Sequence, residues 1–295
     1  MRSVIFIGAG DQGSYQMRGI QATQALEKYH NLKVPYVLSS QILENIDNVK
    51  NYILVFIGEP IFHCRTLDNL IKLSKHNILV YDVVDNFCFD HTNPFVNDAL
   101  IEAYKYLNVL IHPNSYSKTK AENIFPNMNH ILMPHQWDIR NENIILSNII
   151  NTNKSAYIGD VRGFTLNREN LKDYVNVYNE PLKHNDKHSL YSVHISFRND
   201  GSNDYLYKPC TKLAISSCFK SILLCNNEES INDIVGDTYP FYIKSEQDVI
   251  NKMDWIKGMT QDELNRHRED TLVIKDYLSP KQTSNRYIDL FKLHI

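Results

Sequence analysis

The sequence has 295 residues, of which 43% are hydrophobic and 22% charged, with 31 Lys and Arg against 34 Asp and Glu. The resulting formal charge of -3 shows no basic excess of the kind that accompanies nucleic-acid binding, so we expect no nucleic-acid partner. The length exceeds what one hydrophobic core usually serves, and this predicts two domains of roughly 150 residues each.

The cysteines and the apolar runs indicate a cytoplasmic protein. The cysteines are odd in number and show no C-x-x-C pair or zinc spacing, which favours reduced, buried thiols. No stretch approaches the roughly 20 apolar residues of a membrane span, and the opening MRSVIFIGAG is too short an apolar run for a signal peptide. We therefore expect no transmembrane segment, and peripheral membrane contact stays open.

Short apolar runs alternate with segments of helical period in the first half of the chain. A strand followed by a helix is the repeating unit of a parallel sheet, so we predict one doubly wound sheet in a domain of residues 1–150. Helical intervals are expected at 15–29, 60–75 and 97–106. The predicted strands are Val4–Ile7, Val34–Leu38, Ile53–Ile57, Ile78–Tyr81, Val109–Ile111 and His130–Met133.

An Asn-rich stretch at about 138–155 predicts the boundary, and a second series of strands follows it. These strands are expected at 156–159, 191–197, 221–224 and 240–243, within a second domain of residues 151–279. The last segment, 280–295, has one apolar helical face formed by Tyr287, Leu290, Phe291 and Leu293. The predicted fold class is thus α/β, with two Rossmann-like parallel-sheet domains and a final amphipathic helix.

A glycine-rich loop follows the first predicted strand. Gly8-Ala9-Gly10-Asp11-Gln12-Gly13 matches G-x-G-x-x-G between a strand and a helix, the context of a dinucleotide site. The ribose-binding acid expected near residues 38–41 is missing, because the chain reads Leu-Ser-Ser-Gln there. Three interpretations stay open: a dinucleotide site, a purely structural turn, and a loop that faces the sugar or the acceptor. We favour the last, with Gly10, Gly13 and Arg18 on the acceptor side.

Two acids follow the predicted strand at 78–81, at the edge where a doubly wound sheet places its ligands. Asp82 and Asp85 are candidates for a general base toward an acceptor hydroxyl, although capping and solvation would explain either one as well. His135, in the segment Met-Pro-His-Gln-Trp-Asp, is a further acceptor-side candidate. The sequence holds no paired-His or acidic cluster at metal spacing, so we predict no metal site.

Cations gather in one stretch of the second domain. A predicted strand ends at Arg198, and a following loop brings Lys208 to the start of a helix whose first turn holds Thr211 and Lys212. Guanidinium, ammonium and hydroxyl groups beside a helix N-terminus suit a diphosphate. Such donors stabilise a diphosphate leaving group as negative charge develops on it, without a metal.

The run YKPCTKLAISSCFKSILLCNNEESINDIVGDTYPF resembles the donor-binding segment of GT-B glycosyltransferases similar to family 4, which carry K-P-x-x-K-L on a helix. YDVVDNF and PHQWD are similar to the acceptor half of such enzymes. The resemblance implies two Rossmann-like domains facing a cleft, with the final helix crossing back to the first domain. It places Arg198, Lys208, Thr211 and Lys212 on the donor's phosphates, and adds Gly159 and Asp233 to that site.

The resemblance implies sugar transfer from a nucleotide-diphosphate sugar to a glycan or other hydroxyl acceptor, with no further cofactor. Gly159-Asp160-Val161-Arg162 departs from the usual Gly-Arg and Lys-Gly pattern, and Asp233 stands where Glu is more common, so retention or inversion stays open. Two alternatives are kept. One is an NAD(P)-linked oxidoreductase or epimerase using the Gly8–Gly13 loop; the other is a non-catalytic sugar-nucleotide-binding module.

Overall fold

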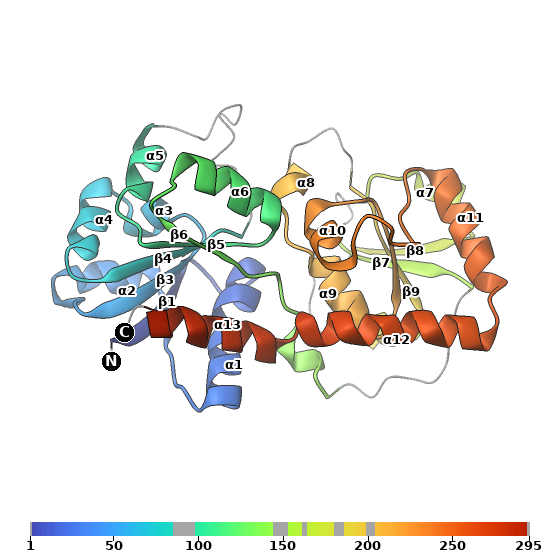
Figure 1. Ribbon diagram of the computed structural model, residues 1–295, viewed down its shortest axis with the longest axis horizontal. Coiled ribbons are helices and arrows are strands. Elements are labelled where there is room, and N and C mark those ends of the chain that lie inside the picture. The colour runs from blue at the N-terminus through green and yellow to red at the C-terminus, as the bar shows by residue number, and fades with distance from the viewer. Residues whose placement is uncertain are drawn as a thin grey trace. The chain divides into compact units, whose positions relative to one another are not determined.

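The computed structural model describes residues 2–84, 98–143, 153–160, 164–179, 186–198 and 204–293. The chain divides into two compact units (Figure 1). The first unit comprises Met1–His135, Leu206–Pro209 and Pro280–Ile295. The second comprises Gln136–Tyr205 and Cys210–Ser279.

The first unit contains a six-stranded parallel sheet in the order β2-β1-β3-β4-β5-β6. Its middle strands are almost continuous apolar runs, as expected where helices cover both faces of a parallel sheet. In β3, for example, every residue from Ile53 to Ile57 is buried. The strands are β1 (Ser3–Gly8), β2 (Tyr36–Leu38), β3 (Tyr52–Ile57), β4 (Ile78–Asp82), β5 (Val109–His112) and β6 (Asn129–Leu132).

Alternate residues of these strands point to opposite faces and form two hydrophobic cores. On one face Phe6 and Val55 pack with Tyr287 and Phe291 of α13 (Pro280–Leu293), which lies against α1 (Gln21–His30). The other face packs against the remaining helices. These are α2 (Ser39–Glu44), α3 (Pro60–Cys64), α4 (Leu67–Ser74) and α5 (Asp98–Tyr104), with α6 (Ser115–Ile124) beside β5 and β6.

The second unit contains a four-stranded parallel sheet in the order β10-β9-β7-β8. Its strands are β7 (Ser155–Gly159), β8 (Val175–Asn179), β9 (Val193–Ser196) and β10 (Ile222–Cys225). Its helices are α7 (Arg168–Leu171), η5 (Asp186–Leu190), α9 (Thr211–Cys218), α10 (Glu229–Val235), α11 (Glu246–Lys257) and α12 (Gln261–Tyr277). The short helix α8 (Asp204–Tyr207) leads into the segment Leu206–Pro209, which belongs to the first unit.

Two elements of the second unit differ from the predicted ones. β8 was not predicted, because its sequence VNVYN interrupts the apolar pattern with asparagines at the edge of the sheet. The predicted strand at 240–243 is reduced to an isolated bridge between Tyr242 and Cys225. Two backbone hydrogen bonds, from Cys225 N–H to the Phe241 carbonyl and from Ile243 N–H to the Cys225 carbonyl, form this bridge, and the adjacent Tyr239 hydroxyl donates to the carbonyl of Leu223.

The change from one unit to the other falls at His135 and Gln136, earlier than the predicted boundary near residue 150. Trp137 explains the position, because it lies in a hydrophobic core of the second unit. Its backbone N–H donates to the Leu278 carbonyl at 3.0 Å and its indole N–H to the Lys275 carbonyl at 2.9 Å. No helix within the described ranges is long and apolar enough to cross a bilayer.

Candidate active site

Gly159, Arg198 and Glu228 lie together at the carboxyl ends of three adjacent strands of the second unit. Gly159 ends β7, Arg198 follows β9 and Glu228 follows β10. The Arg198 backbone N–H donates to Asn226 Oδ1 at 3.2 Å, and Arg198 Nη1 donates to Glu228 Oε2 at 2.9 Å. Glu228 is only 2% exposed, whereas Arg198 is 27% exposed. The ion pair therefore holds the guanidinium in place while part of it stays open to a ligand.

Lys212 reaches this edge from the first turn of α9. Its Nζ donates to the Ile158 carbonyl and lies 4.5 Å from the centroid of the Tyr157 ring. A Cβ on Gly159 would lie 2.6 Å from this Nζ. Glycine at 159 is therefore explained within the protein, because it leaves room for the lysine side chain.

The charges at this edge do not cancel. Burial, together with the neighbouring Arg198 guanidinium, lowers the pKa of Lys212 to about 7. The carboxylate of Glu228 pairs with Arg198 and not with Lys212. Two basic groups thus lie close together at the carboxyl ends of parallel strands, where an anionic ligand would relieve their repulsion.

The other predicted donor-site residues lie on α9, on α10 and in the first unit. Thr211 is the first residue of α9, directly before Lys212, and is partly buried. Asp233 is exposed on α10. Lys208 belongs to the first unit, where its carbonyl accepts a hydrogen bond from Asn114 Nδ2 at 3.3 Å. The structure therefore unites Gly159, Arg198 and Lys212, and the roles of the other three stay predictions.

The sequence reasoning missed Glu228 and Tyr157. A signal for Glu228 was present, because it comes three residues after the last residue of β10, as Asp85 does after the end of β4. Tyr157 offers no such signal, since it lies inside an apolar strand and only the fold brings the Lys212 ammonium to its ring.

In the first unit, Asp82 lies at the end of β4 in a buried ion pair with Arg18. The guanidinium approaches both carboxylate oxygens, with Nε to Oδ2 at 2.9 Å and Nη2 to Oδ1 at 2.7 Å. The Tyr287 hydroxyl of α13 donates to Oδ2 at 2.8 Å. Arg18 and Asp82 are 2% and 0% exposed. This arrangement suits a residue that positions the strand end, and Asp85 lies outside the described residues.

Arg18 also fixes the segment that contains His135. Its Nη1 donates to the carbonyls of Met133 at 3.0 Å and Pro134 at 3.2 Å. His135 is buried with Nε2 3.4 Å from Met17 Sδ, and burial and the Arg18 charge lower its pKa to about 3. The imidazole is therefore neutral near pH 7, and Arg18 acts as a structural link among three elements.

The side chain of Tyr36 packs against the glycine-rich loop that follows β1. The Tyr36 hydroxyl donates to the Gly10 carbonyl, and a Cβ on Gly8 would lie 1.9 Å from Tyr36 Oη. A Cβ on Gly19 would lie 2.5 Å from Tyr36 Cε2. Gly13 is exposed and has φ +56°, a conformation that favours glycine. Packing and turn geometry explain glycine at 8, 13 and 19, whereas Gly10 has no such contact, and the acceptor-side role of Gly10, Gly13 and Arg18 stays a prediction.

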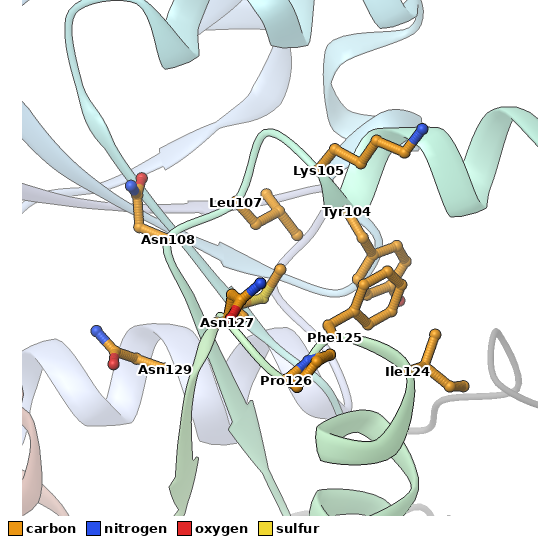
Figure 2. A pocket seen from close by; sticks show the side chains of 10 residues that line it. Tyr104, Lys105, Leu107, Asn108, Ile124, Phe125, Pro126, Asn127 and Asn129 are labelled. Carbon is orange, nitrogen blue, oxygen red and sulfur yellow. The ribbon is translucent and has the colours of Figure 1, made fainter.

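A pocket of about 560 Å³ lies in the first unit near the amino ends of β5 and β6. Figure 2 shows it between the ends of α5 and α6, where the rings of Tyr104 and Phe125 stack at a centroid distance of 5.0 Å. Its lining includes Asn108, which directly precedes β5, and Asn129, which begins β6. None of the predicted site residues lines this pocket.

Four cysteines lie within the described residues. Cys64, Cys210, Cys218 and Cys225 are buried and form no disulfide, as expected for reduced thiols. Within the described parts of the chain, no group of three or more His, Cys, Asp or Glu side chains is placed to hold a metal ion.

The comparisons with known proteins give matches among solved structures only; no family model and no curated protein matches the sequence. Alr3699/HepE from Anabaena, solved with UDP and glucose, aligns over 99% of this chain and 100% of its own, with a TM-score of 0.66 and 8% identity. The chain has the fold of a GT-B glycosyltransferase. A glycosyltransferase from Rickettsia africae aligns over 99% and 98%, with a TM-score of 0.62 and 10% identity.

A third structure, an α-glucosyltransferase in complex with UDP and a 13-mer DNA, aligns over 99% of both chains, with a TM-score of 0.58 and 11% identity. The predicted fold class of two Rossmann-like parallel-sheet domains is therefore confirmed, whereas membership of family 4 stays a prediction. Because this fold also occurs in a protein crystallised with DNA, the expectation of no nucleic-acid partner rests on composition alone.

Proposed function

We propose that the protein transfers a sugar from a nucleotide-diphosphate sugar to a hydroxyl acceptor without a metal ion. The observation that carries the proposal is the meeting of Arg198 and Lys212 at the carboxyl ends of β7 and β9. The fold supports it, because the solved structures that share this fold include proteins crystallised with UDP or UDP-glucose.

The two cations would act on the donor's diphosphate. As the bond between sugar and diphosphate breaks, negative charge accumulates on the departing phosphate oxygens, and fixed positive groups stabilise that charge. Glu228 holds Nη1 of Arg198. Within the described residues, Nε and Nη2 of Arg198 make no hydrogen bond to protein, so a planar pair of donors is available to phosphate oxygens.

The first unit would supply the acceptor side. Asp85 remains our proposed general base, three residues beyond the buried Asp82. The Arg18–Asp82 ion pair would fix the end of β4 and so the chain leading toward Asp85. The acceptor class we propose is a glycan or another hydroxyl compound.

Donor binding is tested by thermal shift and calorimetry with UDP-glucose, GDP-glucose, ADP-glucose and NAD(P). We expect one nucleotide sugar to stabilise the protein and NAD(P) to leave it unchanged. Arg198→Met and Lys212→Met should each weaken binding at least tenfold at pH 6.5, since each removes a charged contact. Lys244→Met, which removes an exposed lysine of the same unit, is the matched control. Stabilisation by NAD(P) alone would instead favour the oxidoreductase alternative.

Turnover separates an enzyme from a binding module. Transfer is assayed from the bound nucleotide sugar to a panel of glycans and to DNA with an HMU base, the ligand of the α-glucosyltransferase crystal. EDTA should leave the rate unchanged. Asp85→Asn should keep donor affinity and reduce transfer at least a hundredfold, the low end for a lost general base. The exposed Asp68→Asn variant is the control; equal rates for both variants would remove Asp85 from the mechanism.

A further inference from the structure

Lys212 is buried among groups from several elements of the second unit, and within the described residues no carboxylate pairs with it. From β7 the Tyr157 ring faces it, and from β9 come His194 and, just beyond the strand, Arg198. His188 of η5 lies on the same side and stacks on Phe219, just after α9. The Glu228 carboxylate pairs with the Arg198 guanidinium.

Within the described residues, Lys212 forms no ion pair with any carboxylate. Its one hydrogen bond to protein goes to the Ile158 carbonyl. The hydrogen bond to the Ile158 carbonyl does not by itself require the ammonium form, since an amine N–H also donates to a carbonyl. The Tyr157 ring favours the charge only weakly, and an added anion would be the first negatively charged partner of Lys212 among the described residues.

We propose that the diphosphate of the donor draws a proton from solvent onto Lys212 Nζ when it binds, so that donor affinity decreases as the pH rises from 6 to 8. This inference rests on the proposed function and describes how the same site responds to pH. The proton comes from the buffer, no covalent bond forms or breaks in the donor, and the amine becomes an ammonium ion.

The titration of the surrounding groups supports this assignment. The pKa of Lys212 is lowered to about 7 by burial and by Arg198, so without a ligand the Lys212 amine is largely neutral at pH 8 and largely charged at pH 6. Burial lowers the pKa of His188 to about 2 and of His194 to about 4, so both stay neutral across this range. Burial raises the pKa of Tyr157, which stays protonated. Among Lys212, His188, His194 and Tyr157, Lys212 is therefore the group that changes charge between pH 6 and 8.

The experiment is isothermal titration of the wild-type protein with UDP-glucose, GDP-glucose and ADP-glucose, in buffers of different ionisation enthalpy. Nucleotide sugars are used because their diphosphate is esterified at both ends and lacks the phosphate ionisation near pH 6. We expect uptake of about 0.9 proton per donor at pH 8 and about 0.1 at pH 6, with affinity about tenfold weaker at pH 8.

Two variants locate the proton. Lys212→Arg keeps a charge at every pH, so its donor binding should be independent of pH and take up no proton. Lys212→Gln, which preserves a donor to the Ile158 carbonyl, should bind more weakly and also without uptake. If either folded variant takes up as much proton as the wild type, another group is responsible and the inference falls.

The outcome distinguishes this inference from the proposed function. Binding of a nucleotide sugar with no proton uptake and equal affinity at pH 6 and 8 would overturn the inference and leave sugar transfer standing. If none of the three nucleotide sugars binds at any pH, the proposed function fails and the inference fails with it.

Discussion

Replacing Arg18 by methionine should strongly destabilise the first unit. The substitution leaves the Asp82 carboxylate, which is 0% exposed, with the Tyr287 hydroxyl as its hydrogen-bond donor, and removes the donor to the carbonyls of Met133 and Pro134. Breaking one side of a buried ion pair costs roughly 3–5 kcal/mol. A domain of this size is stable by only about 5–15 kcal/mol, so the loss would be a large fraction of the total.

The measurement is urea unfolding followed by two signals. The chain has two tryptophans, Trp137 and Trp255, and both belong to the second unit. Tryptophan fluorescence therefore reports the second unit, whereas far-UV circular dichroism reports both. We expect Arg18→Met to move the circular dichroism midpoint to lower urea by the equivalent of about 3 kcal/mol or more.

A double-mutant cycle and a surface control complete the test. Asp82→Asn keeps an acceptor for the Tyr287 hydroxyl, and combining it with Arg18→Met should cost less than the sum of the single changes by about 1–3 kcal/mol. Lys105→Met removes an exposed partner of Glu102 and should cost under about 0.5 kcal/mol. If Arg18→Met costs no more than Lys105→Met, the ion pair does not hold the end of β4 as we argue.

The remaining predictions concern the glycine loop and the buried histidines. Gly8→Ala should destabilise by roughly 1–3 kcal/mol, because the new methyl would lie 1.9 Å from Tyr36 Oη, and adding Tyr36→Val should recover part of the loss in urea melts. Burial and the neighbouring His130 lower the pKa of His112 to about 3, so its contribution to stability is complete above pH 6.5 and is lost as the pH falls toward 3. At pH 5 the loss should be about 2 kcal/mol, and a His112→Gln variant with an unchanged pH slope would disprove this origin.

The central strands of the sheets were predictable because their sequences are continuous runs of apolar residues. Residues 53–57 are all apolar, and this local pattern alone predicts a strand that is buried on both faces. β8 was missed because it lies at the edge of its sheet, where asparagines at 176 and 179 interrupt its apolar residues. The unit boundary depended on Trp137, whose partners at 275 and 278 no local pattern reveals.

The same distinction applies to the candidate site. Arg198 and Lys212 were predictable because a strand end and a helix start carry chemical meaning in the sequence itself. The burial of Asp82 was not, because its partners lie 64 residues away at Arg18 and 205 residues away at Tyr287. The sequence around a carboxylate at a strand end is the same whether the carboxylate faces a ligand or pairs with an arginine.

The discontinuity of the first unit sets an order for its assembly during translation. All residues of the second unit have left the ribosome once Ser279 emerges, whereas the first unit still lacks α13. Until Tyr287 and Phe291 arrive, Phe6 lacks its cover and Asp82 lacks one of its hydrogen-bond donors. The half of the protein that is made first is therefore the half that is finished last, and one apolar face of its sheet stays uncovered until the final helix packs on it.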